Sequence, residues 1–299
     1  MTSTLSPDVG PPRRRPGLAR EVGGWRVLAD AAAGTRKGPD GRCQDAFAVA
    51  VVPSAVGWVL VAACADGAGS VPHAELGAVL ASRHGRDGLR RLVRRLPVGR
   101  TPQGQEAMVV FQEVRATLLA QAAAMAVPVR DLATTLHLVA AAPGWTLCAQ
   151  IGDGAIVVRP LAPEGGLLLA LQPDRGEYAN MTRFVTDEAL AVQAVVLPPA
   201  AAVAVLTDGL SPLALHHPGV VVHEGAPLAA MSDEPPTLPP LAAYLPFFTG
   251  LFAELARAAP VTLQRPFHAF LTSPAVQART DDDVSLVLAM RTDAARLRQ

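Results

Sequence analysis

Four apolar stretches of the chain each meet an aspartate at one end, and this pattern constrains the fold more than any other feature. Residues 58–66, 145–153 and 201–208 run forward into Asp-Gly pairs, and residues 284–290 follow three aspartates. Short apolar runs bounded by turn residues predict buried strands. Neighbouring antiparallel strands bring opposite ends to one sheet edge, so one reversed strand among three forward ones allows the acids to converge.

A single Asp-Gly pair after a strand is more often a hairpin turn than a binding site, because this dipeptide is a favoured turn sequence. The repetition along the chain favours a site instead. Gly67 and Gly69 follow Asp66, and the missing side chains leave space for a ligand beside the backbone. The sequence therefore predicts that Asp66 lies where a core strand meets a ligand.

Composition favours one large domain and excludes several classes of protein. The chain has 299 residues, half of them apolar, and a net charge of zero, so nothing indicates nucleic-acid binding. The apolar stretches are shorter than the roughly 20 residues of a membrane span. Cys43, Cys64 and Cys148 are far apart and form no Cys-x-x-Cys motif, which argues against zinc and disulfide scaffolds and predicts a reducing cytoplasm.

Residues 1–20, rich in proline and arginine, are predicted to be a disordered tail, and residues 21–293 one domain. Apolar spacing predicts helices over 72–96, 106–126, 242–258 and 266–278, with strands between them. The cluster of Arg90, Arg91, Arg94 and Arg95 near the end of the first helix is interpreted as a solvated face, with a docking site as the lesser alternative.

Carboxylates that converge repel one another and raise each other's pKa, so such a cluster needs cations. The acids expected to converge are Asp66, Asp153, Asp208 and Asp282. Ligation by oxygen alone selects hard ions such as Mg2+ or Mn2+. Two such ions about 4 Å apart can activate a water and clamp a phosphate. The acids therefore indicate two-metal hydrolysis of a phosphoester.

Six short motifs occur in the order found in the metal-dependent type-2C protein phosphatases, and the chain resembles the bacterial branch of that family. The motifs are Gln44-Asp45, Ala65-Asp66-Gly67-Ala68-Gly69-Ser70, Thr134-Thr135-Leu136, Gly152-Asp153-Gly154, Thr207-Asp208-Gly209 and Asp281-Asp282-Asp283-Val284-Ser285. Each motif is weak alone, but together they extend over about residues 23–291.

The resemblance implies an α+β fold, a four-layer α-β-β-α sandwich in which two packed antiparallel sheets are flanked by helices. It implies hydrolysis of phosphoserine or phosphothreonine in a protein by a water that two Mn2+ or Mg2+ ions activate. Asp153 matches the position that contributes to a third ion. The expected partners are a phosphorylated protein and a cognate Ser/Thr kinase, with neither nucleic acid nor membrane.

The resemblance also assigns roles to individual residues. Asp66 would bridge both metal ions, and the Gly67 carbonyl would bind one of them. Asp208 and Asp282 would complete the shell of the other ion, and Asp45 would orient metal-bound waters.

Three positions depart from the family pattern. Gln44 stands where the family often has Glu, and an amide is a poorer ligand for a hard cation. Ala68 stands where many eukaryotic members have a His proposed to protonate the leaving group. No arginine lies at the usual distance before Asp45, so either Arg36 or Arg42 is the candidate for phosphate binding.

Three functional hypotheses follow from these residues. The first is an active phosphatase. The second, motivated by Gln44 and Ala68, is a catalytically weak or inactive relative that acts as a phosphoprotein-binding regulatory module. The third is a dinucleotide-binding protein that uses Gly67-Ala68-Gly69, but the third glycine of that motif would fall at Pro72, and no alternation of strands and helices follows.

Overall fold

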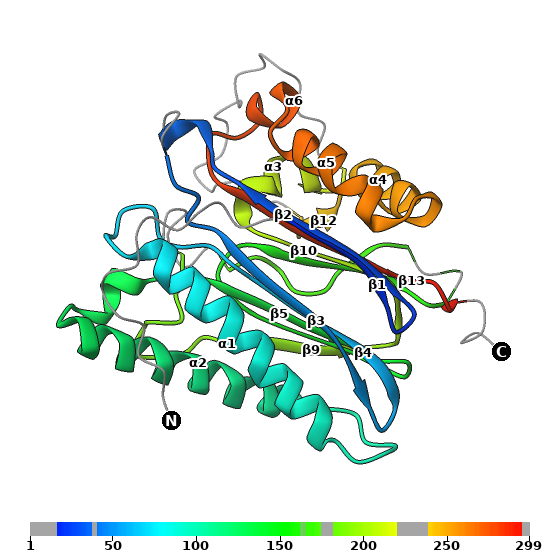
Figure 1. Cartoon of the computed structure of the whole chain (residues 1–299), viewed down its shortest axis with the longest axis horizontal. Helices are drawn as coiled ribbons and strands as arrows, with labels where there is room; N and C mark the ends of the chain where they lie inside the picture. Colours follow the sequence, from blue (N-terminus) through cyan, green and yellow to red (C-terminus); the bar gives the residue numbers. More distant parts are fainter. Residues whose placement is uncertain are drawn as a thin grey trace.

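The computed structural model describes residues 17–37, 41–162, 164, 166–174, 182–219 and 239–294. Two antiparallel sheets lie face to face, with helices on both outer faces (Figure 1). This is the α-β-β-α sandwich that the resemblance implied. Among the described residues, no helix combines the length and apolar character needed to cross a bilayer.

The first sheet combines strands from the start, middle and end of the chain. In spatial order it contains β1 (Leu18–Val22), β2 (Trp25–Ala32), β13 (Val284–Arg291), β10 (Ala200–Leu206), β7 (Ala155–Pro160) and β8 (Leu168–Leu169). Every neighbouring pair is antiparallel. The last strand, β13, thus lies between β2 and β10, so the first and last strands of the described chain belong to the same sheet.

The second sheet is formed by the middle of the chain. Its order is β3 (Ala46–Ser54), β4 (Gly57–Ala65), β5 (Leu136–Ala141), β6 (Thr146–Ile151) and β9 (Gln193–Leu197). A separate two-stranded ribbon pairs β11 (Leu215–His216) with β12 (Ala242–Ala243). In both large sheets the strands are antiparallel, so their ends alternate in direction at each edge.

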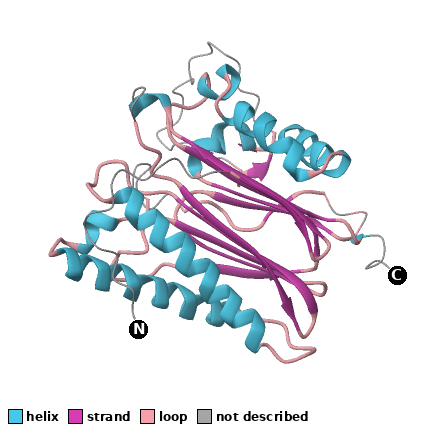
Figure 2. Ribbon diagram, in the orientation of Figure 1, coloured by secondary structure: helices cyan, strands magenta, loops and turns pink. Residues whose placement is uncertain are grey.

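Each outer face of the sandwich has its own set of helices (Figure 2). The second sheet is covered by α1 (Ala74–Arg95) and α2 (Gly104–Met125), and the first by α3 (Ser211–Ala214), α4 (Leu245–Arg257), α5 (Pro260–Leu271) and α6 (Pro274–Gln277). Three 3-10 turns, η1 (Thr35–Lys37), η2 (Val129–Leu132) and η3 (Asp208–Leu210), lie in connections.

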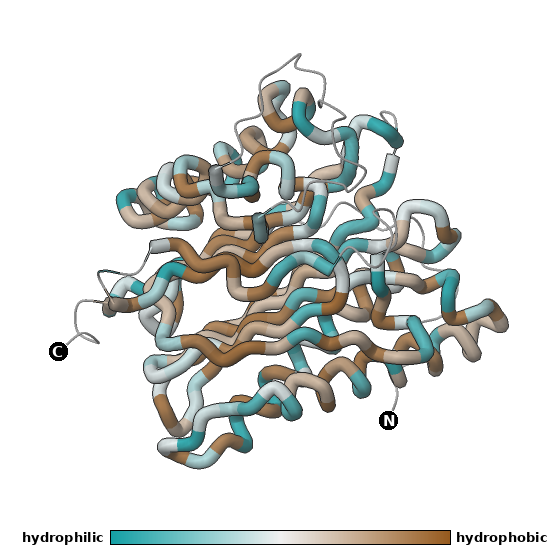
Figure 3. The backbone as a smooth tube through the Cα atoms, turned by 180° about the vertical axis from the view of Figure 1, so that it is seen from behind, coloured by the Kyte–Doolittle hydropathy of each residue, from teal (hydrophilic) through white to brown (hydrophobic). Residues whose placement is uncertain are grey.

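Three apolar layers hold the sandwich together, and β4 shows how the sequence supplies two of them. Val59, Val61 and Ala63 face α1 and α2, whereas the alternating residues Leu60, Ala62 and Cys64 face the other sheet. This follows from the two-residue period of a strand. Because both faces are covered, β4 is a continuous apolar run, and the strands form the hydrophobic centre of the molecule (Figure 3).

The third layer lies between the first sheet and its helices. Phe248 and Phe252 of α4 and Phe267 of α5 are buried there against strands that include β10 and β13. Phe248 and Phe252 are four residues apart and therefore lie on the same helix face. This aromatic layer fixes α4 and α5 over the sheet, away from the sheet edge where the aspartates lie.

The boundary predicted between the N-terminal tail and the domain is wrong by three residues, because β1 begins at Leu18. Residues 18–20, expected in a disordered tail, belong to β1, which pairs with β2 from Leu18 opposite Ala29 to Val22 opposite Trp25. Gly23 and Gly24 form the connecting turn with positive φ angles, which glycine adopts readily. Residues 1–16 of the expected tail lie outside the described residues.

The expected strands and the first two helices are confirmed, but the two C-terminal helices begin elsewhere. Residues 242–243 pair as β12, and α4 begins only at Leu245. The next helix begins at Pro260, not Pro266, and Pro266 lies inside it. Proline is favoured in the first helical turn, so two prolines six residues apart leave the start ambiguous in the sequence.

Two helical glycines give a matched test of the packing around α1. A Cβ at Gly77 of α1 would lie 2.2 Å from the carbonyl oxygen of Leu132, whereas a Cβ at Gly250 of α4 would meet nothing within 4 Å. Alanine favours a helix over glycine by about 0.5–1 kcal/mol, but overpacking against backbone costs about 1–3 kcal/mol. We expect Gly250→Ala to raise and Gly77→Ala to lower the free energy of unfolding.

Urea unfolding followed by circular dichroism measures both changes. If Gly77→Ala were as stabilising as Gly250→Ala, the close contact between α1 and η2 would not exist in solution.

Candidate metal centre

Asp66 directly follows β4, and two threonines hold its backbone. Thr134 Oγ1 and the Thr135 backbone N–H each donate to the Asp66 carbonyl oxygen at 2.8 Å, and Thr135 Oγ1 accepts from the Asp66 N–H at 3.0 Å. Gly67 forms a bridge to Thr134, and a Cβ there would lie 2.4 Å from the carbonyl oxygen of Ala74. Residue 67 therefore has to be glycine, and the position of Asp66 is fixed.

Asp208 and Asp282 come from adjacent strands of the other sheet. Asp208 follows β10 and Asp282 precedes β13, and the antiparallel pairing of these strands brings the two ends together. The backbone is tightly packed here, since a Cβ at Gly209 would lie 2.0 Å from the Asp283 carbonyl oxygen. The glycine of this Asp-Gly pair is thus required by the close approach of two chain segments.

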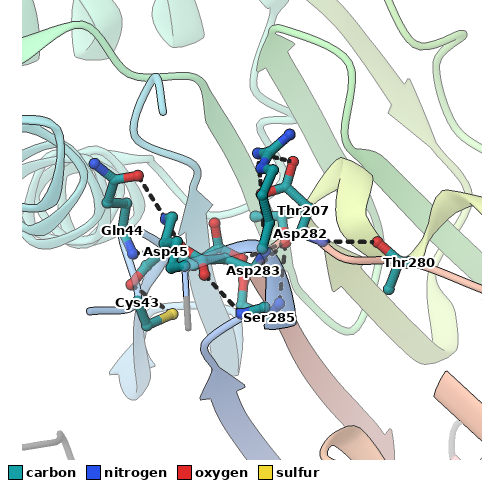
Figure 4. A network of polar contacts seen from close by, with 11 residues as sticks. Cys43, Gln44, Asp45, Thr207, Thr280, Asp282, Asp283 and Ser285 are labelled. Atoms are coloured by element: carbon teal, nitrogen blue, oxygen red, sulfur yellow. Dashed lines mark hydrogen bonds and ion pairs between the residues drawn. The ribbon is translucent and has the colours of Figure 1, made fainter. Parts of the chain in front are cut away.

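Asp45 connects the two sheets. It precedes β3, and its Oδ2 accepts a hydrogen bond of 2.6 Å from Oγ1 of Thr207, the residue that directly follows β10. The same Thr207 oxygen accepts from the Ser285 backbone N–H at 3.0 Å. Figure 4 shows Asp45, Asp282 and Asp283 gathered around this contact. The carboxyl group of Asp45 is buried, and its Oδ1 has no hydrogen-bond partner other than a neighbouring acid.

Burial and the charges of nearby acids raise the pKa values of the two innermost acids. Burial raises the pKa of Asp45 to about 8, and the charge of Asp283 adds to this rise. Burial also raises the pKa of Asp66 well above its usual range, with further contributions from Asp45 and Asp208. Asp45 and Asp66 lie at the ends of adjacent strands of the second sheet, and acids of the first sheet, Asp208 among them, raise the pKa of both.

Asp208 and Asp153 form the outer part of the same cluster. Burial, together with the charges of Asp153 and Asp282, raises the pKa of Asp208 to about 6. Asp153 follows β6 after Gly152, which has a φ of 107°, and its Oδ2 accepts from Thr182 Oγ1 at 2.8 Å. The structure therefore brings together all five aspartates singled out in the sequence, from the ends of five strands.

The turn after β2 supplies the nearest cations. Arg36 Nη2 lies 3.0 Å from both carboxylate oxygens of Asp282. Lys37 Nζ forms an ion pair with Asp283 and donates to Gln44 Oε1 at 2.5 Å. The Gln44 backbone N–H donates to Asp283 Oδ2 at 2.6 Å. These two cations partly neutralise Asp282 and Asp283, which directly precede β13.

For Arg42, the other candidate for phosphate binding, no contact with an acid is found among the described residues. Arg42 lines a cavity of about 400 Å³ together with Cys43, Asp45 and His268. Arg36 is thus the candidate arginine that contacts one of the acids directly.

Several contributing residues were not assigned a role from the sequence. Lys37 is the only lysine in the chain, and no motif in the sequence marks it as part of a site. Asp283, the last of three consecutive aspartates, is buried and accepts from the Gly34 N–H at 2.8 Å as well as from Lys37. Its position directly before an apolar strand was the available signal. The cross-sheet contact of Thr207 had no signal in the sequence.

The carboxylates fit hard divalent cations. Among the described residues, no three side chains of His, Cys, Asp or Glu come close enough to hold one ion by themselves. Mg2+ does not require such a group, because it commonly binds one or two carboxylates and completes an octahedral shell with waters and other oxygens. Asp45 Oδ1 is buried without a partner other than a neighbouring acid, and the raised pKa values indicate that added positive charge would stabilise the ionised acids.

Comparison with known families gives a match over most of the chain. Residues 36–260 match the model of the family described as protein phosphatase 2C. The serine/threonine-protein phosphatase 3 of Escherichia coli K12 is 35% identical over 276 residues, which cover 89% of this chain and 98% of that protein.

Solved structures with the same fold are more distant in sequence. The catalytic domain of the serine threonine protein phosphatase PstP, in complex with two manganese ions, superposes with a TM-score of 0.53 at 17% identity, over 89% of this chain and 97% of that chain. RsbX in complex with magnesium has a TM-score of 0.52 at 10% identity, over 92% and 100%. At these identities the structures show a shared fold.

The raised pKa of Asp45 predicts how the stability of the metal-free protein depends on pH. The carboxyl group ionises near pH 3.8 in a model peptide but near pH 8 in the fold. Between these values the folded state binds more protons than the unfolded state, so raising the pH favours unfolding, by up to about 1.4 kcal/mol per pH unit for one proton. In EDTA we expect Asp45→Asn to reduce this loss of stability between pH 5 and 8.

The measurement is urea unfolding at several pH values, with Asp281→Asn, a change at an exposed neighbouring aspartate, as the control. Equal pH slopes for Asp45→Asn and wild type would show that Asp45 is ionised throughout this range.

Proposed function

Because the chain belongs to the protein phosphatase 2C family, it is a metal-dependent serine/threonine phosphatase, and we propose that its aspartate cluster is the catalytic metal centre. The observation that carries this proposal is the convergence of Asp45, Asp66 and Asp208. Burial raises the pKa of each of these acids, and so do the charges of neighbouring acids in the cluster. Such an arrangement is costly for a fold unless cations bind it. The cofactors are Mn2+ or Mg2+, and the substrate is a phosphorylated protein.

The proposed ligands follow the positions of the acids. Asp66 is close enough to Asp45, Asp208 and Asp282 for their charges to raise its pKa, which supports it as the ligand that both metal ions would share, with the Gly67 carbonyl beside it. Asp208 and Asp282 would complete the shell of one ion, and Asp153 would serve a third. When bound, the metals neutralise the acids and lower the pKa of a coordinated water, which can then attack the phosphorus atom.

The protein's own groups would orient that water and the phosphate. Asp45 Oδ1 is buried and accepts no hydrogen bond from a group other than the neighbouring acid Asp66, while Thr207 fixes the other oxygen at 2.6 Å. This supports a role for Oδ1 as the acceptor that holds the attacking water in line. Arg36 is the better candidate for the phosphate, because its half-exposed guanidinium contacts Asp282, and the planar fork binds phosphate oxygens in pairs.

The contacts of Gln44 argue against an inactive regulatory relative. Its side-chain oxygen accepts from Lys37, and its backbone N–H donates to Asp283. Gln44 therefore positions the lysine and a buried acid, and the substitution of Glu by Gln removes no carboxylate from those that converge. No contact in the described structure favours the regulatory alternative over catalysis.

A Ser/Thr kinase in the same cell is the expected source of the substrate, because hydrolysis of a phosphomonoester requires a reaction that forms it. We also propose a cytoplasmic location, on the grounds that the three cysteines are free and that free thiols persist in reducing compartments. Residues 18–293 would form one catalytic domain, since β2 near the start of the described chain pairs with β13 near its end.

Replacing single aspartates tests the metal centre. We expect Asp66→Asn and Asp282→Asn to lower kcat/KM for para-nitrophenyl phosphate with Mn2+ by at least about 100-fold, because even outer-shell partners of a metal typically contribute 10–100-fold. EDTA should abolish the activity of wild type. The matched control is Asp281→Asn, one residue away and exposed, which should remain within about twofold.

If the Asp66 and Asp282 variants kept wild-type turnover, the cluster would not be the metal centre. If wild type bound Mn2+ in calorimetry without any turnover, the regulatory alternative would be favoured.

Ala68 predicts a strong dependence on the leaving group. No histidine follows Asp66-Gly67 to protonate the departing oxygen, so esters of low leaving-group pKa should react much faster than alkyl phosphates. A series of aryl and alkyl phosphates measures the slope of log kcat/KM against leaving-group pKa. Ala68→His should make that slope shallower, and a flat slope in wild type would contradict the prediction.

A further inference from the structure

A groove lined by arginines runs along one side of the sandwich, between the outermost strands of the two sheets. β1 is the edge of the first sheet and β3 is the edge of the second. The groove has a volume of about 640 Å³ and is lined by β1, by residues 47–53 of β3, and by α1. In Figure 1, α1 runs along the outer side of β3, and β1 lies on the opposite side. We call this feature the arginine groove.

One face of α1 supplies the charge of the groove. Arg83, Arg86, Arg90 and Arg94 all line it, and their spacing of three, four and four residues places them on one helix face. They extend over about 17 Å of helix. Arg20 of β1 adds a fifth cation from the other side. The sequence interpretation of the helix arginines as a solvated face is therefore incomplete, because part of the cluster borders a defined groove.

Few of these charges are neutralised by neighbouring acids. Within the described part of the chain, Asp87 pairs with Arg86 and Arg90. Arg83 and Arg94 form no ion pair within the described residues, and both side chains are exposed. Because the whole chain has a net charge of zero, the excess of positive charge is local to this groove.

The floor of the groove is apolar and has the shape of a strand edge. Phe47, Val49 and Val51 of β3 and Leu18 of β1 are partly buried against the layer between the sheets. β3 pairs with β4 on one side only. The other edge of β3 therefore presents backbone groups with which an extended chain can pair, as in recognition by strand addition.

The groove adjoins a second cavity that reaches Asp45, one acid of the cluster. Phe47 lines both the arginine groove and the cavity of about 400 Å³ that includes Asp45 and Arg42. A peptide lying along β3 would thus enter the site region with the residues that flank its phosphorylated side chain. This continuity indicates the substrate, rather than an unrelated partner, as the occupant.

We propose that the arginine groove binds an extended, acidic segment of the phosphoprotein substrate as an added strand along β3. This inference rests on the proposed function. The seven lining residues of β3 correspond to about 20 Å of extended chain, so the acidic segment would be six or seven residues long. The N-terminal residues 1–16 of this chain are poor candidates for the same place, because they contain three arginines and one aspartate.

A single-stranded nucleic acid is the main competing occupant for a basic groove. Such sites typically offer aromatic side chains on which bases stack. The lining residues include one aromatic side chain, Phe47, which is partly buried. The apolar floor and the strand edge therefore favour a peptide.

The first test compares two phosphopeptides that contain the same phosphothreonine and a six-residue arm. Every second residue of the arm is Glu in one peptide and Gln in the other. The arm is placed before the phosphothreonine in one pair of peptides and after it in a second pair. In one of the two placements we expect the Glu arm to raise kcat/KM about tenfold through a lower KM, because three exposed ion pairs each contribute modestly. The gain should shrink as salt is raised, because exposed charges are screened. Methylating alternate backbone nitrogens of that arm should remove the gain.

Two neighbouring arginines of α1 provide matched variants. Arg94 lines the arginine groove, whereas Arg95 lines the cleft between α1 and α2 on the other side of the helix, and both are exposed. We expect Arg94→Glu, and more strongly Arg83→Glu/Arg94→Glu, to abolish the advantage of the Glu arm, and Arg95→Glu to retain it. Turnover of para-nitrophenyl phosphate should be unchanged in all three.

The possible outcomes separate the docking proposal from the catalytic one. Equal kcat/KM for Glu and Gln arms, with normal turnover of para-nitrophenyl phosphate, would overturn the docking site and leave the phosphatase intact. Absent turnover of para-nitrophenyl phosphate would instead count against the catalytic proposal. In that case fluorescence anisotropy of the labelled Glu-arm peptide tests the docking site separately. Binding that is lost in Arg83→Glu/Arg94→Glu but kept in Arg95→Glu would support docking, and binding that is equal in both variants would overturn it. Tighter binding of a ten-nucleotide oligothymidylate than of this peptide would overturn it.

Discussion

Repulsion among buried carboxyl groups is the constraint on which the rest of this structure depends. Asp45, Asp66 and Asp208 are held close enough that each is affected by neighbouring acids, and burial adds to the cost of ionising them. Ordinary packing would separate such groups or pair each with a cation. Here Arg36 and Lys37 pair only with the acids at the end of β13, so the innermost carboxyl groups remain available to metal ions.

The sandwich keeps these acids together because each one ends a strand whose position the core fixes. β4 is buried on both faces, and β10 and β13 are buried along their whole length. Threonine hydroxyls complete the arrangement, with Thr134 and Thr135 holding the backbone of Asp66 and Thr207 holding the side chain of Asp45. A catalytic group on a rigid strand end needs little reorganisation when substrate binds, so with the metal centre proposed at these acids, apolar packing far from them matters for the chemistry.

The same architecture creates the arginine groove as a consequence of having two sheets with free edges. β1 and β3 end their sheets on the same side, and α1 lies along β3. Edge strands are liabilities unless they are covered, charged or used. A row of arginines beside the β3 edge discourages pairing between copies of this chain, since like charges would meet, while it favours acidic segments. Protection and recognition can therefore have the same physical origin.

The sequence by itself determined the core strands, the first two helices and the acids at the strand ends, because apolar periodicity and Asp-Gly turns are local signals. It also indicated hard metal ions, since the acids outnumber other ligand types at those ends. Only the tertiary structure decided that Leu18–Val22 joins the first sheet, that Lys37 pairs with Asp283 and that Thr207 reaches Asp45. These contacts join segments separated by up to 246 residues in the case of Lys37 and Asp283. The packing of two sheets, which no local pattern encodes, brings such segments together.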